Sequence, residues 1–295
     1  MSTSASQISE RDLAVDVPSS DVPMQYFESE GGISLRGFYE LWVYRHLVWM
    51  LVVRDVKVRY RQTAVGVAWA VLQPALLMLV FNIFFQLLGR QPSEGNVPYV
   101  VTFLCGYLPW QLLASTLGAA TQSLVAHQNL ISKVYFPRAV LPISATVGGL
   151  IDFCIACVLL LGLMVWYGVV PPVQIILLPL FVLLSLLISI GAGLWLSALN
   201  ALYRDIGYVV PFILQVGFFI SPVIYETDQL IPGQYRSIYA LNPMVGVLEG
   251  VRWCILGHAA PTLSSMVISF VTLGLLLVGG MIYFRQIERQ VVDRI

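Results

Sequence analysis

The stretch Arg54–Pro74, RDVKVRYRQTAVGVAWAVLQP, decides the fold class. Four basic residues (Arg54, Lys57, Arg59 and Arg61) directly precede an apolar run that contains no charged residue as far as Leu88. A run of this length can cross a bilayer as a helix, because ~20 apolar residues at a rise of ~1.5 Å match a hydrocarbon core of ~30 Å. Basic residues that flank a span are held on the cytoplasmic side. The stretch therefore predicts an integral membrane protein and its orientation.

The composition of the whole chain agrees with this prediction. Hydrophobic residues make up 58% of the sequence and charged residues 11%, whereas soluble domains carry about 25% charged residues. The 16 basic and 16 acidic side chains give a net charge of zero. The overall charge therefore points neither to nucleic acid nor to an acidic substrate as a partner.

Two segments precede the first span. Residues 1–34 are acidic, rich in Ser, Pro and Gly, and carry a single basic residue, Arg11, so we expect a disordered cytoplasmic tail. This segment lacks the basic start and apolar core of a signal peptide. Residues 35–62 favour an amphipathic helix lying on the membrane surface, although they could also begin a longer spanning helix. Arg45 and Arg59 fall off the polar face of that helix, which predicts a kink or break.

Five further apolar segments predict an all-α fold with six transmembrane helices over residues 63–295. We place them at Pro98–Ala120, Ala139–Gly168, Val173–Asn200, Ile206–Tyr225 and Leu263–Phe284. With this topology, only Arg90, Arg236 and Arg252 of the 16 basic residues lie on the outer side, so both termini should be cytoplasmic. No internal repeat is visible, which weakens the case for a secondary transporter built from two homologous halves.

Small residues in two of the spans indicate helix packing. Ser185, Ser189, Gly193 and Ser197 recur every four residues in the fourth span, which favours a close-packing face over a pore lining. Cys154 and Cys157 form a C-x-x-C within the third span, where small apolar packing residues are the expected interpretation.

The outer segment between the last two spans, Glu226–Ala260, contains an amphipathic helix. Asn242 and Pro243 form a helix cap and a favoured first helical residue, and Gly257 ends the helix. Apolar residues recur between them at helical spacing, namely Met244, Val247, Leu248, Val251 and Ile255. The helix either docks on the outer ends of the spans or dips into the membrane as part of a re-entrant pair of short helices.

Several segments together resemble a known family, the membrane subunits of type-2 ABC exporters of bacterial cell-surface polysaccharide (O-antigen, capsule or teichoic acid). The segments are RYRQTAVGVAW at Arg59–Trp69, LISKVYFPRAVLP at Leu130–Pro142, LNALYRDI at Leu199–Ile206, FFISPVIY at Phe218–Tyr225 and LNPM at Leu241–Met244. The resemblance implies a permease in the inner membrane that exports lipid-linked polysaccharide. It also implies a homodimer that works with two cytoplasmic ATPase subunits.

The residues also support a separation between this permease and a partner subunit that hydrolyses ATP. A phosphate-binding loop ends in Lys followed by Ser or Thr, but the only lysines, Lys57 and Lys133, follow no Gly-rich turn. We therefore expect no cofactor in this chain and ATP with Mg²⁺ on the partner ATPase. The resemblance makes the segment between the second and third spans a coupling helix, with the basic interfacial helix as a second support; a solvated connecting loop is the alternative. The residues are Asn129, Lys133, Tyr135, Phe136, Pro137, Arg138, Arg54, Lys57, Arg59 and Arg61.

A sugar polymer needs aromatic faces and hydrogen-bonding groups along its path. The candidates within the spans are Trp69, Asn82, Phe85, Gln86, Tyr107, Trp110, Gln215, Phe218 and Phe219. Aromatic belts at the membrane surface and amide bridges between helices are the structural alternatives. Asn242, Pro243 and Met244 are candidates for an outer gate.

Asp152 is the one strong candidate for an ionisable group within a span, where a carboxyl group is costly and normally faces protein or water. It could be hydrogen-bonded to a neighbouring span or to the second protomer, lie nearer the cytoplasmic interface, or relay protons. The last role would suit an ion-coupled secondary transporter. A membrane-embedded glycan transferase, built on the charged residues of the outer segment, and an exporter of small hydrophobic drugs are further alternatives. His46, His127 and His258 lie too far apart in sequence to suggest a metal site, and no catalytic triad or carboxylate pair is evident.

Overall fold

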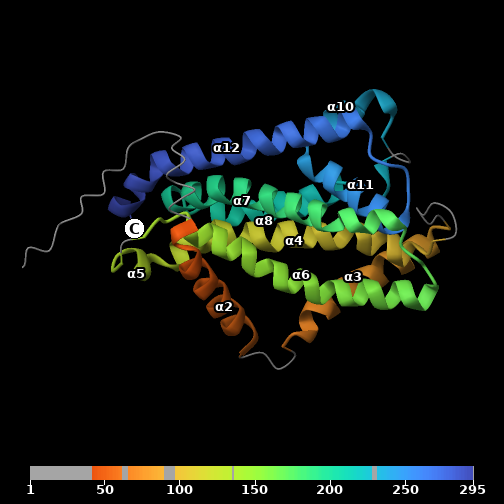
Figure 1. Cartoon of the computed structure of the whole chain (residues 1–295), viewed down its shortest axis with the longest axis horizontal. Helices are drawn as coiled ribbons and strands as arrows, with labels where there is room; N and C mark the ends of the chain where they lie inside the picture. Colours follow the sequence, from red (N-terminus) through yellow and green to blue (C-terminus); the bar gives the residue numbers. More distant parts are fainter. Residues whose placement is uncertain (1–41, 62–65, 90–96, 135, 228–230, 295) are drawn as a thin grey trace, which may run out of the picture. The chain divides into compact units, whose positions relative to one another are not determined.

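The computed structural model describes residues 42–61, 66–89, 97–134, 136–227 and 231–294. Within these ranges all regular secondary structure is helical (Figure 1). The long helices are α2 (Arg45–Arg61), α3 (Ala68–Leu87), α4 (Tyr99–Ala126), α6 (Val140–Tyr167), α7 (Leu178–Leu202), α8 (Ile206–Ile220), α11 (Pro243–Leu256) and α12 (Leu263–Arg294). The short elements are α5 (Gln128–Ile131), η2 (Val173–Leu177), η3 (Gly233–Tyr235) and α10 (Arg236–Tyr239).

Helix α4 forms the centre of the bundle, between α6 and α7 (Figure 1). Within its most apolar stretch 83% of the residues are buried, against 11% in α3. Helix α12 packs on α7, and α11 lies against α4, α7 and α12. Helix α5 and the C-terminus lie at one end of the bundle, and α10 and α11 lie toward the other (Figure 1). We call these the α5 end and the α11 end.

The small residues Ser185, Ser189, Gly193 and Ser197 form a ridge on α7 that packs against α4, as their spacing predicts. Ser189 is fully buried and lies 2.9 Å from the hydroxyl of Thr116, which donates a hydrogen bond to it. A Cβ atom at Gly193 would lie 2.8 Å from the Cβ of Ala120, so a larger residue at either position would push the helices apart. The predicted packing role of this ridge is confirmed.

In the part of the chain that the structure describes, five helices are long and apolar enough to cross a membrane: α3, α4, α6, α12 and the continuous helical segment 173–202 formed by η2 and α7. The predicted fifth span, Ile206–Tyr225, is only partly helical, because α8 ends at Ile220 and Ser221 has an extended backbone. Its 15 residues extend over ~22 Å at a rise of ~1.5 Å per residue. Pro222 follows directly and cannot donate the backbone hydrogen bond that would continue the helix.

The helix boundaries at α11 are those that the sequence predicts. The side chain of Asn242 accepts a hydrogen bond of 3.1 Å from the backbone N–H of Met244, and Pro243 is the first helical residue. Gly257 closes the helix with φ 71°, in the left-handed region that glycine adopts without strain. Local hydrogen bonding and backbone preference account for both boundaries.

Helix α2 packs against α6 and begins at Arg45, so the part of the predicted interfacial helix up to residue 41 lies outside the described residues, as does the predicted tail. Leu51 and Val52 of α2 are buried, whereas Trp49 of α2 and the preceding Trp42 are exposed. Gly66 has φ 54° and lies two residues before α3. The chain therefore breaks its helical path here instead of running from α2 directly into the first span.

Candidate functional site

The segment predicted to couple to an ATPase lies at the α5 end (Figure 1). Asn129 and Lys133 are exposed, and Val134 is 54% exposed. Phe136, which the sequence suggests as an apolar anchor for the partner, is only 5% exposed. It packs with Leu124 and other residues of the core, so in this protomer it stabilises the segment from within. Tyr135 lies outside the described residues.

The next residues tie this segment to the last helix. Pro137 is half-buried, and the backbone N–H of Arg138 donates a hydrogen bond of 3.0 Å to the Glu288 carboxylate on α12. The Arg138 guanidinium also donates to the backbone carbonyl of Glu288. These bonds hold the start of α6 against the end of α12.

Helix α2 is joined to the same end of the bundle through His127. The Nδ1 atom of His127 lies 2.7 Å from the backbone carbonyl of Ser123; a carbonyl only accepts, so Nδ1 carries the proton. Nε2 is then free to accept a hydrogen bond from Arg54, which it contacts. Arg54 also forms an ion pair of 2.7 Å with Asp55. Of the other basic residues of α2, Lys57 and Arg61 are exposed.

Arg59, a further basic residue of α2, forms a cluster with Tyr60 and Asp152. The Arg59 guanidinium and the Tyr60 hydroxyl each donate to a different oxygen of the Asp152 carboxylate. Burial raises the pKa of Tyr60 to about 12, and the hydrogen bond to Asp152 contributes further, so this hydroxyl keeps its proton at neutral pH. Within the described residues, Asp152 therefore bonds to α2, the predicted interfacial helix of its own protomer, and not to a neighbouring span.

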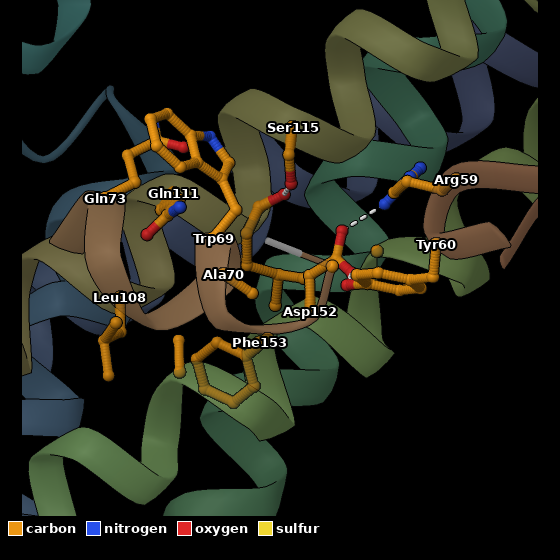
Figure 2. Close-up of a pocket in the computed structure, with 14 residues that line it drawn as sticks. Arg59, Tyr60, Trp69, Ala70, Gln73, Leu108, Gln111, Ser115, Asp152 and Phe153 are labelled. Atoms are coloured by element: carbon orange, nitrogen blue, oxygen red, sulfur yellow. Dashed lines mark hydrogen bonds and ion pairs between the residues drawn. The ribbon is translucent and has the colours of Figure 1, made fainter. Parts of the chain in front are cut away.

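A cavity of about 520 Å³ adjoins this cluster and is bounded by α2, α3, α4 and α6. Figure 2 shows Arg59, Tyr60 and Asp152 together at one side and Gln73 and Gln111 farther away. We name this space the Trp69 cavity. Its lining residues are Arg59, Tyr60, Gly66, Trp69, Ala70, Gln73, Leu108, Gln111, Leu112, Ser115, Gly149, Asp152, Phe153 and Ala156. The sequence analysis singled out neither Gln73 nor Gln111, although each is an amide within an apolar helix.

Five of the predicted path residues lie in one aromatic cluster instead of along the Trp69 cavity. Phe218 of α8 contacts the rings of Tyr107 and Trp110 at centroid distances of 6.2 and 6.4 Å and that of Phe219 at 5.2 Å. Phe85 joins the cluster through rings of α3 and α4. Tyr107 and Trp110 are only 6% and 7% exposed, because they pack α4 against α8. In this protomer they are packing residues and do not line an open path.

The other predicted path residues face outward to different degrees. Trp69 is 55% exposed, Gln86 and Gln215 are exposed, and Asn82 is half-buried. Only Trp69 among them lines the cavity described above.

The candidate outer gate is part of a connection between α8 and α11. The Asn242 amide donates a hydrogen bond of 2.9 Å to the hydroxyl of Ser221, while Met244 is 1% exposed. Asn242 thus both caps α11 and holds the end of α8, and Met244 is a core residue at this position.

Arg252 of α11 is a residue whose role the sequence analysis missed. Its side chain is 4% exposed and donates hydrogen bonds of 2.9 and 2.8 Å to the backbone carbonyls of Tyr225 and Val223. A Cβ atom at Gly106 of α4 would lie 2.6 Å from the guanidinium, so glycine makes room for it. The signal in the sequence was an arginine one turn beyond Leu248, close to the apolar face of α11.

Comparison with known proteins places this architecture in a family. The family model of the ABC-2 type transporter matches residues 46–256. The chain is 34% identical over 224 residues to the O-antigen export system permease protein RfbA of Myxococcus xanthus, covering 75% of this chain and 85% of that protein. It is 28% identical over 222 residues to RfbA of Klebsiella pneumoniae, covering 75% and 84%. It is 27% identical over 243 residues to the polysialic acid transport protein KpsM of Escherichia coli, covering 79% and 90%. This chain therefore belongs to the ABC-2 type transporter family.

Proposed function

We propose that this chain is the permease subunit of an ATP-driven exporter that moves lipid-linked polysaccharide across the inner membrane. The observation that carries the proposal is the similarity to an O-antigen export permease, which extends over 85% of that protein's length. Similarity to a polysialic acid transport protein over 90% of its length supports the same substrate class. The two relatives' names differ in polymer, so the proposal extends to polysaccharide as a class.

The proposed topology has six spans with both termini in the cytoplasm and α10 and α11 as a re-entrant pair on the outer side. Helix α8, although shorter than the other spans, is an apolar helix and would be the fifth span. The α5 end, which carries the exposed Lys133, and helix α2, which carries the exposed Lys57 and Arg61, would face the cytoplasm because basic residues are retained there. Helix α2 and the preceding Trp42 would lie along that surface, with Trp42 and Trp49 directed to lipid.

The proposed assembly contains a second copy of the chain and two cytoplasmic ATPase subunits that bind ATP with Mg²⁺. Helices α3 and α8 expose broad apolar faces in the single protomer, including Ile83, Phe84, Phe212 and Phe219. These faces suit contact with lipid and with a second copy. The ATPase would contact the segment that runs from α5 to Val134. Here Lys133 offers a positive charge and Val134 an apolar side chain.

The first experiment tests the function itself. In its bacterial host, depletion of the chain should abolish polysaccharide at the cell surface and leave lipid-linked polymer inside, measured by surface labelling before and after lysis. Collapse of the proton gradient at constant ATP should leave export unchanged, because Asp152 is held by Arg59 and Tyr60 and is not a free relay. Surface polymer that persists without the chain would refute the proposal, and gradient-dependent export would favour an ion-coupled transporter.

A second experiment tests the coupling segment. Val134→Asp combined with Lys133→Glu should reduce co-purification of the ATPase about tenfold or more, since loss of a central interface contact commonly costs over 1–2 kcal/mol. Surface polymer should fall in parallel while the amount of inserted protein stays normal. Ser264→Asp, an exposed position near the start of α12, is the matched control. Unchanged co-purification in the double variant would exclude this segment as the coupling element. Phe136→Ala is unsuitable because it would empty a buried site.

A further inference from the structure

The Trp69 cavity gathers polar side chains from α2, the proposed interfacial helix, and from the apolar helices α3, α4 and α6. Gln111 and Ser115 lie near the middle of α4, and Asp152 lies ~18 Å along α6 from its first residue at ~1.5 Å per residue. Polar and ionisable groups at membrane depth are costly, and they commonly mark the pathway of a substrate. Here they come from separate helices and converge on one space (Figure 2).

The charge of the cavity selects against an anionic ligand. Among the described residues that line it, Arg59 and Asp152 carry the only charges, and they are bonded to each other. A phosphate that took the Arg59 guanidinium would compete with the Asp152 carboxylate, which now pairs with that guanidinium. A neutral ligand leaves the ion pair intact.

The hydrogen-bonding groups fit a ligand with many hydroxyls. Gln111 lines the cavity, and its amide has unused hydrogen-bonding capacity, because the buried Oε1 atom has no hydrogen-bond partner among the described residues. The Asp152 carboxylate has lone pairs beyond the two in use, and Arg59 has further N–H groups to donate. Hydroxyl groups both donate and accept, and can therefore satisfy all three side chains.

The apolar part of the cavity fits the faces of a sugar ring. Trp69 is 55% exposed, and its indole carries a negative face that attracts the weakly positive C–H groups of a pyranose. Leu108, Leu112 and Phe153 supply apolar walls. The volume of about 520 Å³ is within the ~300–1,000 Å³ range of small-ligand sites, which combine apolar walls with a few convergent polar groups.

We infer that the Trp69 cavity binds a neutral sugar unit of the exported polymer, with Trp69 against the ring and Gln111, Arg59 and Asp152 bonded to its hydroxyls. This inference rests on the proposed export of polysaccharide and adds a binding site within the protomer. Tyr60 is a positioning residue, because its hydroxyl orients the Asp152 carboxylate.

Site-specific photocrosslinking in intact cells tests the site. Phe153→p-benzoylphenylalanine, in the full chain with its native partners, places the probe in the cavity and keeps an aromatic ring on α6. Irradiation should yield a high-mass adduct that periodate shortens, since periodate cleaves vicinal diols. The adduct should be absent from cells that make no polymer. Val158→p-benzoylphenylalanine is the matched control: Val158 is 66% exposed and lies about 140° around α6 from Phe153 at ~100° per residue.

Variants of the lining residues sharpen the test. Trp69→Leu and Gln111→Leu should each lower the Phe153 adduct about tenfold, the change expected when a contact of ~1.4 kcal/mol is lost, whereas Trp69→Phe should retain it. Asp152→Asn should lower the adduct if the ligand is neutral. An increase with Asp152→Asn would show an anionic ligand attracted to the freed Arg59 and would overturn the inference.

A failure of the proposed cavity site can be distinguished from a failure of the proposed function. A periodate-resistant adduct of phospholipid mass at Phe153 would show that an acyl chain fills the cavity and would also overturn the inference. If the Phe153 variant accumulates poorly, the same probe at Trp69, which is exposed on α3, applies the same criteria. Absence of a sugar adduct at both positions, in cells whose surface polymer still depends on this chain, refutes the cavity site alone. Surface polymer that is independent of the chain refutes the proposed function.

Discussion

Arg252→Met should destabilise the protein by about 2–5 kcal/mol, because a buried backbone carbonyl that loses its partner costs about 1–3 kcal/mol and this change strips two. The carbonyls are those of Val223 and Tyr225, in the turn that follows α8. Glu226, which is 7% exposed, would also lose a nearby positive charge. Thermal unfolding in detergent, followed by size-exclusion fluorescence, should show a lower midpoint and reduced membrane accumulation.

Two variants serve as controls for Arg252→Met. Arg204→Met removes an exposed arginine from the connection between α7 and α8 and should leave the midpoint nearly unchanged. Arg252→Lys keeps the charge but lacks the planar fork of donors that reaches both carbonyls, so its midpoint should lie between those of Arg252→Met and the wild type. Equal stability of Arg252→Met and the wild type would show that these hydrogen bonds do not hold the turn.

Gly250→Ala should destabilise the protein at or above the upper end of the ~1–3 kcal/mol that overpacking usually costs. A Cβ atom at Gly250 of α11 would lie 2.0 Å from the ring of Phe181 on α7. Phe181 is 2% exposed, and the cavity that it lines, about 20 Å³, is too small to take the displaced ring. The added methyl group would therefore separate α11 from α7, which the same thermal unfolding measurement would record.

A double variant isolates this contact. Phe181→Leu should be destabilising alone, but it should remove much of the extra cost of Gly250→Ala when both are present, since contacting residues are not additive. Gly162→Ala on α6 is the control, because nothing lies within 4 Å of its added Cβ and alanine favours a helix by ~0.5–1 kcal/mol. Additive effects of Gly250→Ala and Phe181→Leu would contradict the packing argument.

Some features of this chain follow from residues that are close in sequence. The charge-free run after Arg61 predicts the first span, and Asn242, Pro243 and Gly257 predict both ends of α11, because caps and φ preferences act within one helical turn. The four-residue spacing of Ser185, Ser189, Gly193 and Ser197 predicts a packing face for a similar reason. The five quoted sequence segments also indicated the family, and the comparisons then established it.

Other features depend on residues far apart in sequence, and only the tertiary structure revealed them. Asp152 meets Arg59 across 93 positions and Arg252 meets Val223 across 29, and no local pattern encodes either pairing. Residue type suggested Phe136 as a partner contact and Tyr107 as a path residue, yet both are buried, since hydrophobicity alone does not distinguish a core from an interface. The Trp69 cavity likewise exists only because α2, α3, α4 and α6 leave a space that their side chains do not fill.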